Sequence, residues 1–370
     1  MKRSDPNFSI AIVDDNAEFL EKLRSALERD LVGEKVELRE WRPVDGQNPV
    51  EFFNGMVDNN TLLVVTDYDL TKGGMTGMFG ANVISWCQDK LIPVGDFSRQ
   101  NIGTTELKED ALFEFRIPTD IENSASFASR LFRGFRSLRE LLSGDDIDLQ
   151  TIRGPAQAMA IVLGRPEEEN LFALYMPPLG AANAPLAASL RAGANQDKNP
   201  DDTERVRLLS YVVGHILANA VLRYCGPILS PEAMCAYVAA PFSERESIGG
   251  IFGDALYRGP FSHGLNYYWR SNVDQLIAVE AAEIQDEVEY ESSGARNRAV
   301  VEIMLHRKLA THDCTRCGGV NGGYLCPFTK RPVCERIDCS VASNNWIPAG
   351  ATASRIEKDF YDEWAPILGF

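Results

Sequence analysis

The sequence lacks any apolar run long enough to cross a membrane. A transmembrane helix needs about 20 consecutive apolar residues, and no such stretch occurs in the 370 residues. The first ten residues carry two basic side chains but no apolar segment of the kind that secretory signals contain. We therefore expect a cytoplasmic protein without membrane insertion.

The sequence is also short of positive charge. It contains 37 basic and 53 acidic side chains, which give a formal net charge of −16. Broad binding to nucleic acid or to an anionic membrane needs a positive surface, so neither is expected of the chain as a whole. A P-loop, a dinucleotide fingerprint and a Ser-His-Asp order are absent as well. None of these enzyme classes is therefore indicated.

Short apolar runs and amphipathic stretches alternate over the first 142 residues. The runs FSIAIV at 8–13 and TLLVVT at 61–66 are typical of buried parallel strands. Further strands are expected over 36–41, 92–97 and 112–116, and helices over 17–29, 82–88 and 124–142. Alternation of this kind predicts a parallel sheet with helices on both faces.

The polar segment SGDDID at 143–148 ends this region. We expect three parts: an α/β domain over 1–142, a mainly helical domain over 149–310 and a Cys-rich module over 311–370. The clearest helical periodicity lies over 203–224, where His215 is expected to be a buried or boundary histidine. The helical region shows no motif that points to a chemical reaction.

Polar residues follow the predicted strands in an order that suits phosphoryl transfer. Asp14 and Asp15 follow the first strand, Asp67 the third, Ser98 the fourth and Arg116 the fifth. Ligands of open α/β sheets bind at the carboxyl ends of the strands. Transfer to a carboxylate requires an acceptor there, a divalent cation, and groups that hold the phosphoryl oxygens.

This ordered set resembles the receiver domain of two-component response regulators. The segment DYDL at 67–70 matches the acceptor segment of that family, and GMTG at 74–77 resembles its continuation. Pro93, five positions before Ser98, matches the signature of the fourth strand. The resemblance covers the first third of the chain and implies a flavodoxin-like sheet of five parallel strands.

The resemblance also implies roles for individual residues. Asp67 would be the phosphoacceptor, and Asp14 and Asp15 would hold Mg²⁺ together with Asp67 and the backbone carbonyl of Asp69. Ser98 would bind a phosphoryl oxygen. The phosphoryl donor would be a histidine kinase or a phosphotransfer protein.

Two positions depart from the family pattern. The family has a Lys before Pro after the fifth strand, whereas this chain has Arg116 with Ile117 inserted before Pro118. An Arg can hold a phosphoryl group as a bidentate donor, but it is not equivalent to Lys. In addition, Thr71-Lys72 stands where the family usually has Pro. A receiver-like domain that is not phosphorylated therefore remains an alternative.

Five of the eight cysteines lie close together near the C-terminus, in DCTRCGGVNGGYLCPFTKRPVCERIDC at 313–339. In a reducing compartment such a cluster indicates metal binding rather than disulfides. Structural Zn²⁺ takes four tetrahedral ligands. The spacing favours Cys314, Cys317, Cys334 and Cys339, with Cys326 as an alternative to either of the last two and His312 as a further candidate.

The region around the cysteines is basic, unlike the rest of the chain. Residues 296–336 hold eight basic and three acidic side chains, a local charge of +5. This patch could bind nucleic acid or dock against acidic parts of the protein. We favour protein contact, because no helix-turn-helix or finger pattern accompanies the charge.

Together these patterns predict a response regulator in which phosphorylation of Asp67 controls a helical and zinc-binding output through protein–protein contacts. Beyond phosphoacceptor and autodephosphorylation chemistry at Asp67, we expect no enzyme activity. The alternatives are a pseudo-receiver scaffold, a receiver-regulated enzyme with a site near His263, and a DNA-binding effector. The sequence leaves open whether the chain forms a homodimer.

Overall fold

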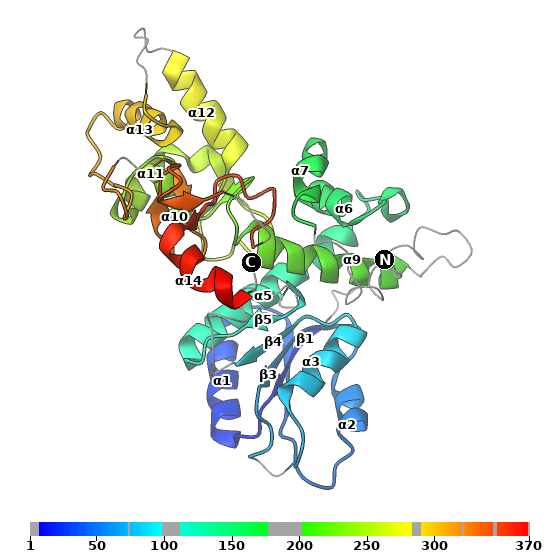
Figure 1. Cartoon of the computed structure of the whole chain (residues 1–370). Helices are drawn as coiled ribbons and strands as arrows, with labels where there is room; N and C mark the ends of the chain where they lie inside the picture. The colour runs from blue at the N-terminus through cyan, green and yellow to red at the C-terminus, as the bar shows by residue number, and fades with distance from the viewer. Residues whose placement is uncertain are drawn as a thin grey trace. The chain divides into compact units, whose positions relative to one another are not determined.

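The computed structural model describes residues 7–72, 75–97, 112–176, 202–282, 290–319, 322–342 and 346–368. They form two compact units (Figure 1). The first comprises Met1–Pro166 and Pro178–Ile216, and the second comprises Glu167–Pro177 and Leu217–Phe370. Among the described helices, none combines the length and the apolar character needed to span a membrane.

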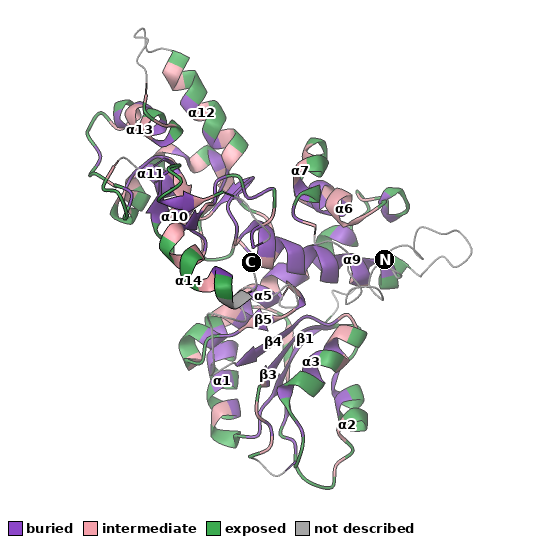
Figure 2. Cartoon of the chain, viewed as in Figure 1, coloured by how far each residue is buried: buried purple, intermediate pink, exposed green. Residues whose placement is uncertain are grey.

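The first unit is built on a five-stranded parallel sheet with strand order β2-β1-β3-β4-β5. The strands are β1 (Phe8–Val13), β2 (Val36–Trp41), β3 (Thr61–Asp67), β4 (Val94–Phe97) and β5 (Phe115–Arg116). β1 is buried throughout and β3 almost throughout, as expected when helices cover both faces (Figure 2). The predicted flavodoxin-like fold is confirmed.

Helices pack on both faces of this sheet, with α1 on one side and α2 and α3 on the other (Figure 1). The described helices of the first unit are α1 (Ala17–Asp30), α2 (Pro49–Met56), α3 (Gly80–Asp89), α5 (Ile121–Leu142), α6 (Pro155–Val162) and α9 (Asp202–Ile216). α5 lies beside α1, and Arg133 of α5 donates hydrogen bonds to Glu34 and to the carbonyl of Asp30 at the end of α1. Short 3₁₀ turns lie over Leu149–Thr151 and Pro166–Glu168.

Helix α9 shares a core with the sheet. A Cβ at Gly214 would lie 2.2 Å from the ring of Phe135 on α5, so the two helices approach closely only because glycine stands there. His215 is fully buried and stacks on Phe115 of β5, with 4.7 Å between ring centroids. The buried His215 that the sequence led us to expect is therefore part of the core of the first unit.

The single helix predicted over 203–224 is interrupted. α9 ends at Ile216 and a π-helical turn follows over Leu217–Val221. Its wider hydrogen-bond spacing is seen in the N–H of Leu222, which donates to the carbonyl of Leu217 at 2.9 Å. Periodicity alone does not distinguish such a turn from the α-helix that precedes it.

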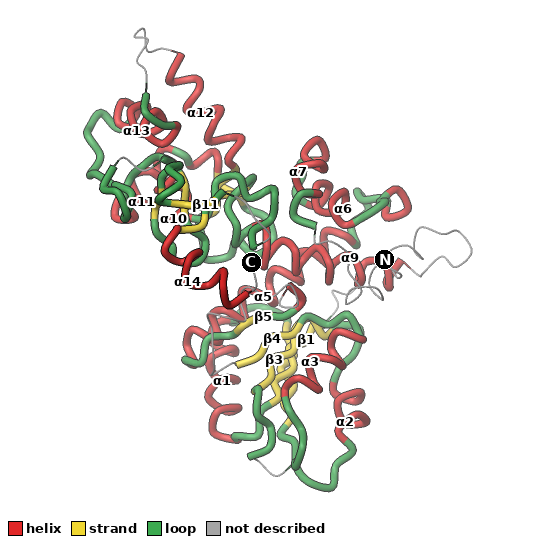
Figure 3. Tube along the Cα trace, viewed as in Figure 1, coloured by secondary structure: helices red, strands yellow, loops and turns green. Residues whose placement is uncertain are grey.

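The second unit is mainly helical with short antiparallel strands (Figure 3). Within the described residues its α-helices are α7 (Glu169–Ala173), α10 (Pro231–Tyr237), α11 (Arg245–Ile251), α12 (Arg270–Ala282), α13 (Ser293–Met304) and α14 (Lys358–Leu368). One sheet has the order β6-β8-β7, from β6 (Ile228–Leu229), β7 (Leu256–Tyr257) and β8 (Tyr267–Trp269). Two strand pairs follow, β9 (Tyr324–Leu325) with β10 (Pro332–Val333), and β11 (Ser340–Val341) with β12 (Ile356–Glu357). Two 3₁₀ turns lie over Phe242–Glu244 and Gly253–Ala255.

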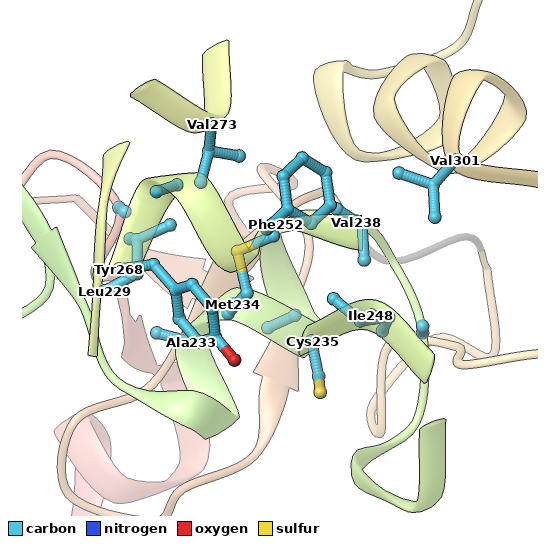
Figure 4. Close-up of a cluster of buried hydrophobic side chains, with 14 of the residues drawn as sticks. Leu229, Ala233, Met234, Cys235, Val238, Ile248, Phe252, Tyr268, Val273 and Val301 are labelled. Carbon is cyan, nitrogen blue, oxygen red and sulfur yellow. The ribbon is translucent and has the colours of Figure 1, made fainter. Parts of the chain in front are cut away.

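The core of the second unit gathers around α10. Met234 and Cys235 of α10 lie within a buried cluster that includes Phe252, Val273 and Val301 (Figure 4). Cys235 is thus a small core residue. The predicted helical middle region and its C-terminal cysteine cluster are both present.

Candidate phosphoacceptor site and cysteine cluster

Three carboxylates meet at the carboxyl edge of the parallel sheet. Asp14 and Asp15 directly follow β1, and Asp67 is the last residue of the neighbouring strand β3. Since Val13 pairs with Thr66 in parallel register, the residues that follow them come to the same level. One carboxylate oxygen from each of the three aspartates lies within 4.8 Å of one from each of the other two.

Backbone groups hold these carboxylates in place. The N–H of Asn16 donates to Asp14 Oδ1 at 2.7 Å, and the N–H of Tyr68 donates to Asp67 Oδ1 at 2.8 Å. Asn16 is also the N-cap of α1, so the turn that carries the acidic pair is fixed to the start of that helix. The site is therefore formed by local structure at two strand ends.

Gly80 lets helix α3 begin against the end of β3. Its N–H donates to the carbonyl of Tyr68 at 2.9 Å, and a Cβ there would lie 2.3 Å from the carbonyl oxygen of Asp67. Any other residue would displace β3 or the helix. Sequence reasoning missed this position, because one glycine before an apolar helix is a weak signal.

The donor set of the three aspartates fits a hard divalent cation. Asp14 and Asp15 are 4% and 7% exposed, and Asp67 is half-buried. Carboxylates this close repel one another, and burial increases the cost because water screens the charges less. Mg²⁺ prefers oxygen ligands and commonly binds through one or two carboxylates plus water. The site can hold Mg²⁺ by this chemistry.

An arginine from the end of β2 also reaches the acidic site. Arg42 directly follows β2, and its Nε donates to the backbone carbonyl of Asp15 at 3.1 Å. The side chain is exposed and uses one of its five N–H donors in this bond. Sequence reasoning did not identify Arg42, since its proximity follows from β2 lying next to β1.

Arg116, the candidate for holding the phosphoryl group, pairs with another residue. It lies opposite Asp96 in the β4–β5 register, and its guanidinium forms an ion pair with the Asp96 carboxylate. Asp96 lies within β4 and is 1% exposed. Burial raises the pKa of Asp96, and the charge of Arg116 partly offsets that rise.

Ile117, and not Arg116, lies at the same height in the sheet as Asp67. Asp67 pairs with Phe97 of β4. Asp96, the residue before Phe97, pairs with Arg116, so continuing the register places Ile117 opposite Phe97. The N–H of Ile117 donates to the carbonyl of Asp96 at 2.9 Å, and a Cβ at Gly95 would lie 2.6 Å from Ile117 Cδ1. The side chain of Ile117 is thus packed into the core, and it carries no charge.

The structure tests neither of two other predicted site residues. Ser98 falls outside the described residues. For Asp69 the predicted metal ligand is the backbone carbonyl, and this stays a prediction. The carboxylate of Asp69 accepts hydrogen bonds from the hydroxyl and the N–H of Thr71, at 2.6 and 3.2 Å, which lower its pKa, and it also pairs with Lys72.

Four cysteines come together in the second unit. The Sγ atoms of Cys314, Cys317, Cys334 and Cys339 lie within 4.8 Å of one another. These are the four that the sequence spacing favoured, whereas Cys326 is buried outside the group. Cys317 Sγ lies 3.7 Å from Cys334 Sγ, and zinc–sulfur bonds of about 2.3 Å in a tetrahedron place sulfurs about 3.8 Å apart. The set fits a tetrahedral Zn²⁺ site.

The glycine turn after the first two cysteines directs N–H groups toward sulfur. Gly318 has a φ of +64°, and the N–H of Gly319 donates to Cys317 Sγ at 3.4 Å. Burial would raise the pKa of Cys314, but N–H donors of Cys317, Arg316 and Cys334 lower it to about 7. Such donors favour the thiolate form, which is the form that binds metal.

The basic patch around the cysteines is largely paired within the second unit. Five of its eight basic residues form ion pairs there: Arg298 and Lys308 with Glu302, Arg307 with Glu244, Arg316 with Asp359, and Arg331 with Glu357. Glu302 and Glu357 are buried. Much of the local excess of positive charge thus has carboxylate partners in the same unit.

No protein-family model matches this chain, and no curated protein matches it. Its function must therefore follow from the two side-chain clusters and from the receiver-like sheet that positions the first of them.

Proposed function

We propose that the first unit is a receiver domain that accepts a phosphoryl group on Asp67 from a histidine kinase or a phosphotransfer protein. The observation that carries this proposal is the group formed by Asp14, Asp15 and Asp67 at the carboxyl edge of a 2-1-3-4-5 parallel sheet. This edge is where open α/β sheets bind their ligands. The three carboxylates would hold Mg²⁺, which offsets the negative charge brought together during transfer.

Transfer would proceed by displacement at phosphorus. A carboxylate oxygen of Asp67 attacks the phosphorus of a phosphohistidine, the phosphorus–nitrogen bond breaks, and the imidazole leaves with the bonding electron pair. The bond from the N–H of Tyr68 orients the Asp67 carboxylate for this attack. Arg42, fixed at Asp15, supplies a guanidinium for the phosphoryl oxygens.

The output would pass through β4, β5 and α9. Phe115 of β5 stacks on His215 of α9, so a shift of β5 changes the surface on which α9 rests. Phosphorylation would act by favouring one of two arrangements of this contact. We propose a protein as the output partner, because carboxylates already neutralise most of the basic patch.

We also propose that the four cysteines bind a structural Zn²⁺. Cys339 directly precedes β11, and its carbonyl accepts a hydrogen bond from the N–H of Lys358 at the start of α14. β11 pairs with β12, which directly precedes that helix. Metal binding at Cys339 would therefore fix the C-terminal strand and helix to the rest of the second unit.

Intact-mass spectrometry tests the receiver proposal. The protein is incubated with acetyl phosphate and Mg²⁺, and wild type is compared with Asp67→Ala. We expect a gain of one phosphoryl group in wild type and none in the variant. A purified chain that gains no phosphoryl group from acetyl phosphate or from any co-encoded kinase would contradict the proposal.

The residues at the end of β5 favour a second candidate function. The residue at the same height in the sheet as Asp67 is the apolar Ile117, and the guanidinium of Arg116 is paired with Asp96. A pseudo-receiver scaffold, which keeps the sheet and acts through constitutive protein contacts, would need no cation there. Titration with Mg²⁺ separates the two functions, because a scaffold has no need to bind the ion.

A further inference from the structure

Two arginines meet at the amino-terminal edge of the sheet, and among the described residues neither has a carboxylate partner. Arg139 of α5 donates to the backbone carbonyl of Asn59 at 3.4 Å, and Arg207 of α9 donates to the side-chain Oδ1 of the same residue. Asn59 lies in the turn before β3, at the opposite end of that strand from Asp67. The seven residues of β3 separate the two edges by about 20 Å.

The charges of this pair are poorly compensated. Arg139 is 9% exposed, and Arg207 Nε is buried with no hydrogen-bond partner within the described part of the chain. Burial, and after it repulsion from Arg207, lower the pKa of Arg139 to about 10. The nearby Asp58 is already paired with Arg39. Two neighbouring guanidinium groups without a counter-charge are costly in a folded protein.

The contrast with other arginines of α5 makes the pair distinctive. Arg133 pairs with Glu34, and Arg136 pairs with both Glu34 and Glu140. Only a few residues farther along the same helix, Arg139 makes its hydrogen bond to a neutral carbonyl. Acidic residues are abundant in a chain with a net charge of −16, yet none of those described pairs with Arg139 or Arg207. A ligand that supplies negative charge would compensate the two guanidinium groups.

From this arrangement we propose that Arg139, Arg207 and Asn59 form a binding site for a doubly charged phosphoryl group, either free phosphate or a phosphate monoester. Two guanidinium groups from adjacent helices match the several oxygens of such a group. The side-chain NH₂ of Asn59 remains a donor, because its Oδ1 accepts from Arg207. A bound anion would hold α9 on α5 at a second point besides the Gly214–Phe135 contact.

Titration calorimetry with inorganic phosphate, in the presence of a metal chelator, tests this site on the full chain. We expect wild type to bind phosphate, and Arg139→Gln and Arg207→Gln each to weaken binding by about ten- to a hundredfold, as expected for charge-assisted hydrogen bonds. Arg136→Gln removes an equal charge from the same helix and should leave binding unchanged. Asp67→Ala should also leave it unchanged, which separates this site from the proposed phosphoacceptor.

Two further results bear on the assignment. Tighter binding of phenyl phosphate than of inorganic phosphate would identify a phosphorylated ligand, and the reverse would identify free phosphate. Phosphate should also raise the thermal midpoint of wild type relative to chloride at equal ionic strength, and should not do so for Arg207→Gln. The proposal is overturned if wild type binds neither anion, or if the Arg136→Gln variant loses binding as fully as the other two.

Discussion

Arg116 on β5 forms an ion pair with Asp96, the buried carboxylate opposite it on β4. Arg116 thus has a structural partner, and it lies one residue before the position in β5 that is level with Asp67. It also explains how β4, an inner strand of the sheet, tolerates an aspartate. The charge of Asp96 is balanced across the strand pair rather than by water.

Replacing Arg116 should therefore affect stability more than phosphoryl transfer. Arg116→Gln leaves Asp96 buried without its cation, which should cost about 1–3 kcal/mol because Arg116 itself is partly exposed. The rate of phosphorylation by acetyl phosphate should change by less than about threefold if Arg116 does not hold the phosphoryl group. Denaturant unfolding and time-resolved intact mass measure the two quantities. A large loss of phosphorylation rate with unchanged stability would show that Arg116 holds the phosphoryl group, as the lysine of the receiver family does.

Replacing Arg42 should have the opposite effect. Arg42 is exposed and donates a hydrogen bond to the carbonyl of Asp15, so Arg42→Gln should leave stability nearly unchanged. The rate of phosphorylation of Asp67 should fall by about tenfold or more, as a charged donor to the phosphoryl oxygens is lost. Arg24, which is also exposed and pairs with Glu28, provides the control through Arg24→Gln. Equal rates for the two variants would exclude Arg42 from the site.

These two arginines mark the limit of what the sequence could predict. Apolar runs and the residues that follow them located the strand ends, and so the group of Asp14, Asp15 and Asp67. The strand β5 contains two residues, and a shift of one residue in such a strand turns each side chain to the other face. Spacing alone therefore could not separate Arg116 from Ile117 as the residue level with Asp67.

Long-range packing limited the prediction in the same way. The position of Arg42 depends on β2 lying beside β1, and the core contact of α9 joins His215 to Phe115, far apart in the sequence. Neither relation leaves a local pattern in the sequence. The cysteine cluster was easier to predict, because thiol ligands recur at short, recognisable spacings.

Gly80 provides a test of how the end of β3, which carries Asp67, is positioned. Gly80→Ala would place a Cβ 2.3 Å from the carbonyl oxygen of Asp67, so we expect a loss of about 1–3 kcal/mol and slower phosphorylation. A Cβ added at Gly55 in α2 would meet no atom within 4 Å, and Gly55→Ala should be neutral or stabilising by up to about 1 kcal/mol. Unfolding midpoints and phosphorylation rates of both variants check the pair. Equal changes in stability and phosphorylation rate for the two variants would show that the helix propensity of alanine, and not the contact with Asp67, determines the effect of Gly80→Ala.

Removing one thiol should identify the zinc ligands. Cys317→Ser should lower bound zinc from about one per chain to near zero, because a structural site needs four ligands. Cys326→Ala should retain zinc, since Cys326 lies outside the group of four. Zinc is measured in the purified proteins by atomic emission. Loss of zinc in the Cys326 variant, with retention in the Cys317 variant, would reassign the site.

His215 should make the stability of the first unit sensitive to acid. Burial lowers the pKa of His215 from 6.5 to about 3, so between these values the unfolded chain binds a proton that the folded one does not. Stability contributed by the neutral ring is therefore complete above pH 6.5 and falls by about 1.4 kcal/mol per pH unit below it. His215→Leu should lose less stability than wild type between about pH 7.5 and 5.0. Unfolding midpoints at the two pH values check this, and identical pH dependence in the two proteins would contradict a neutral, buried His215.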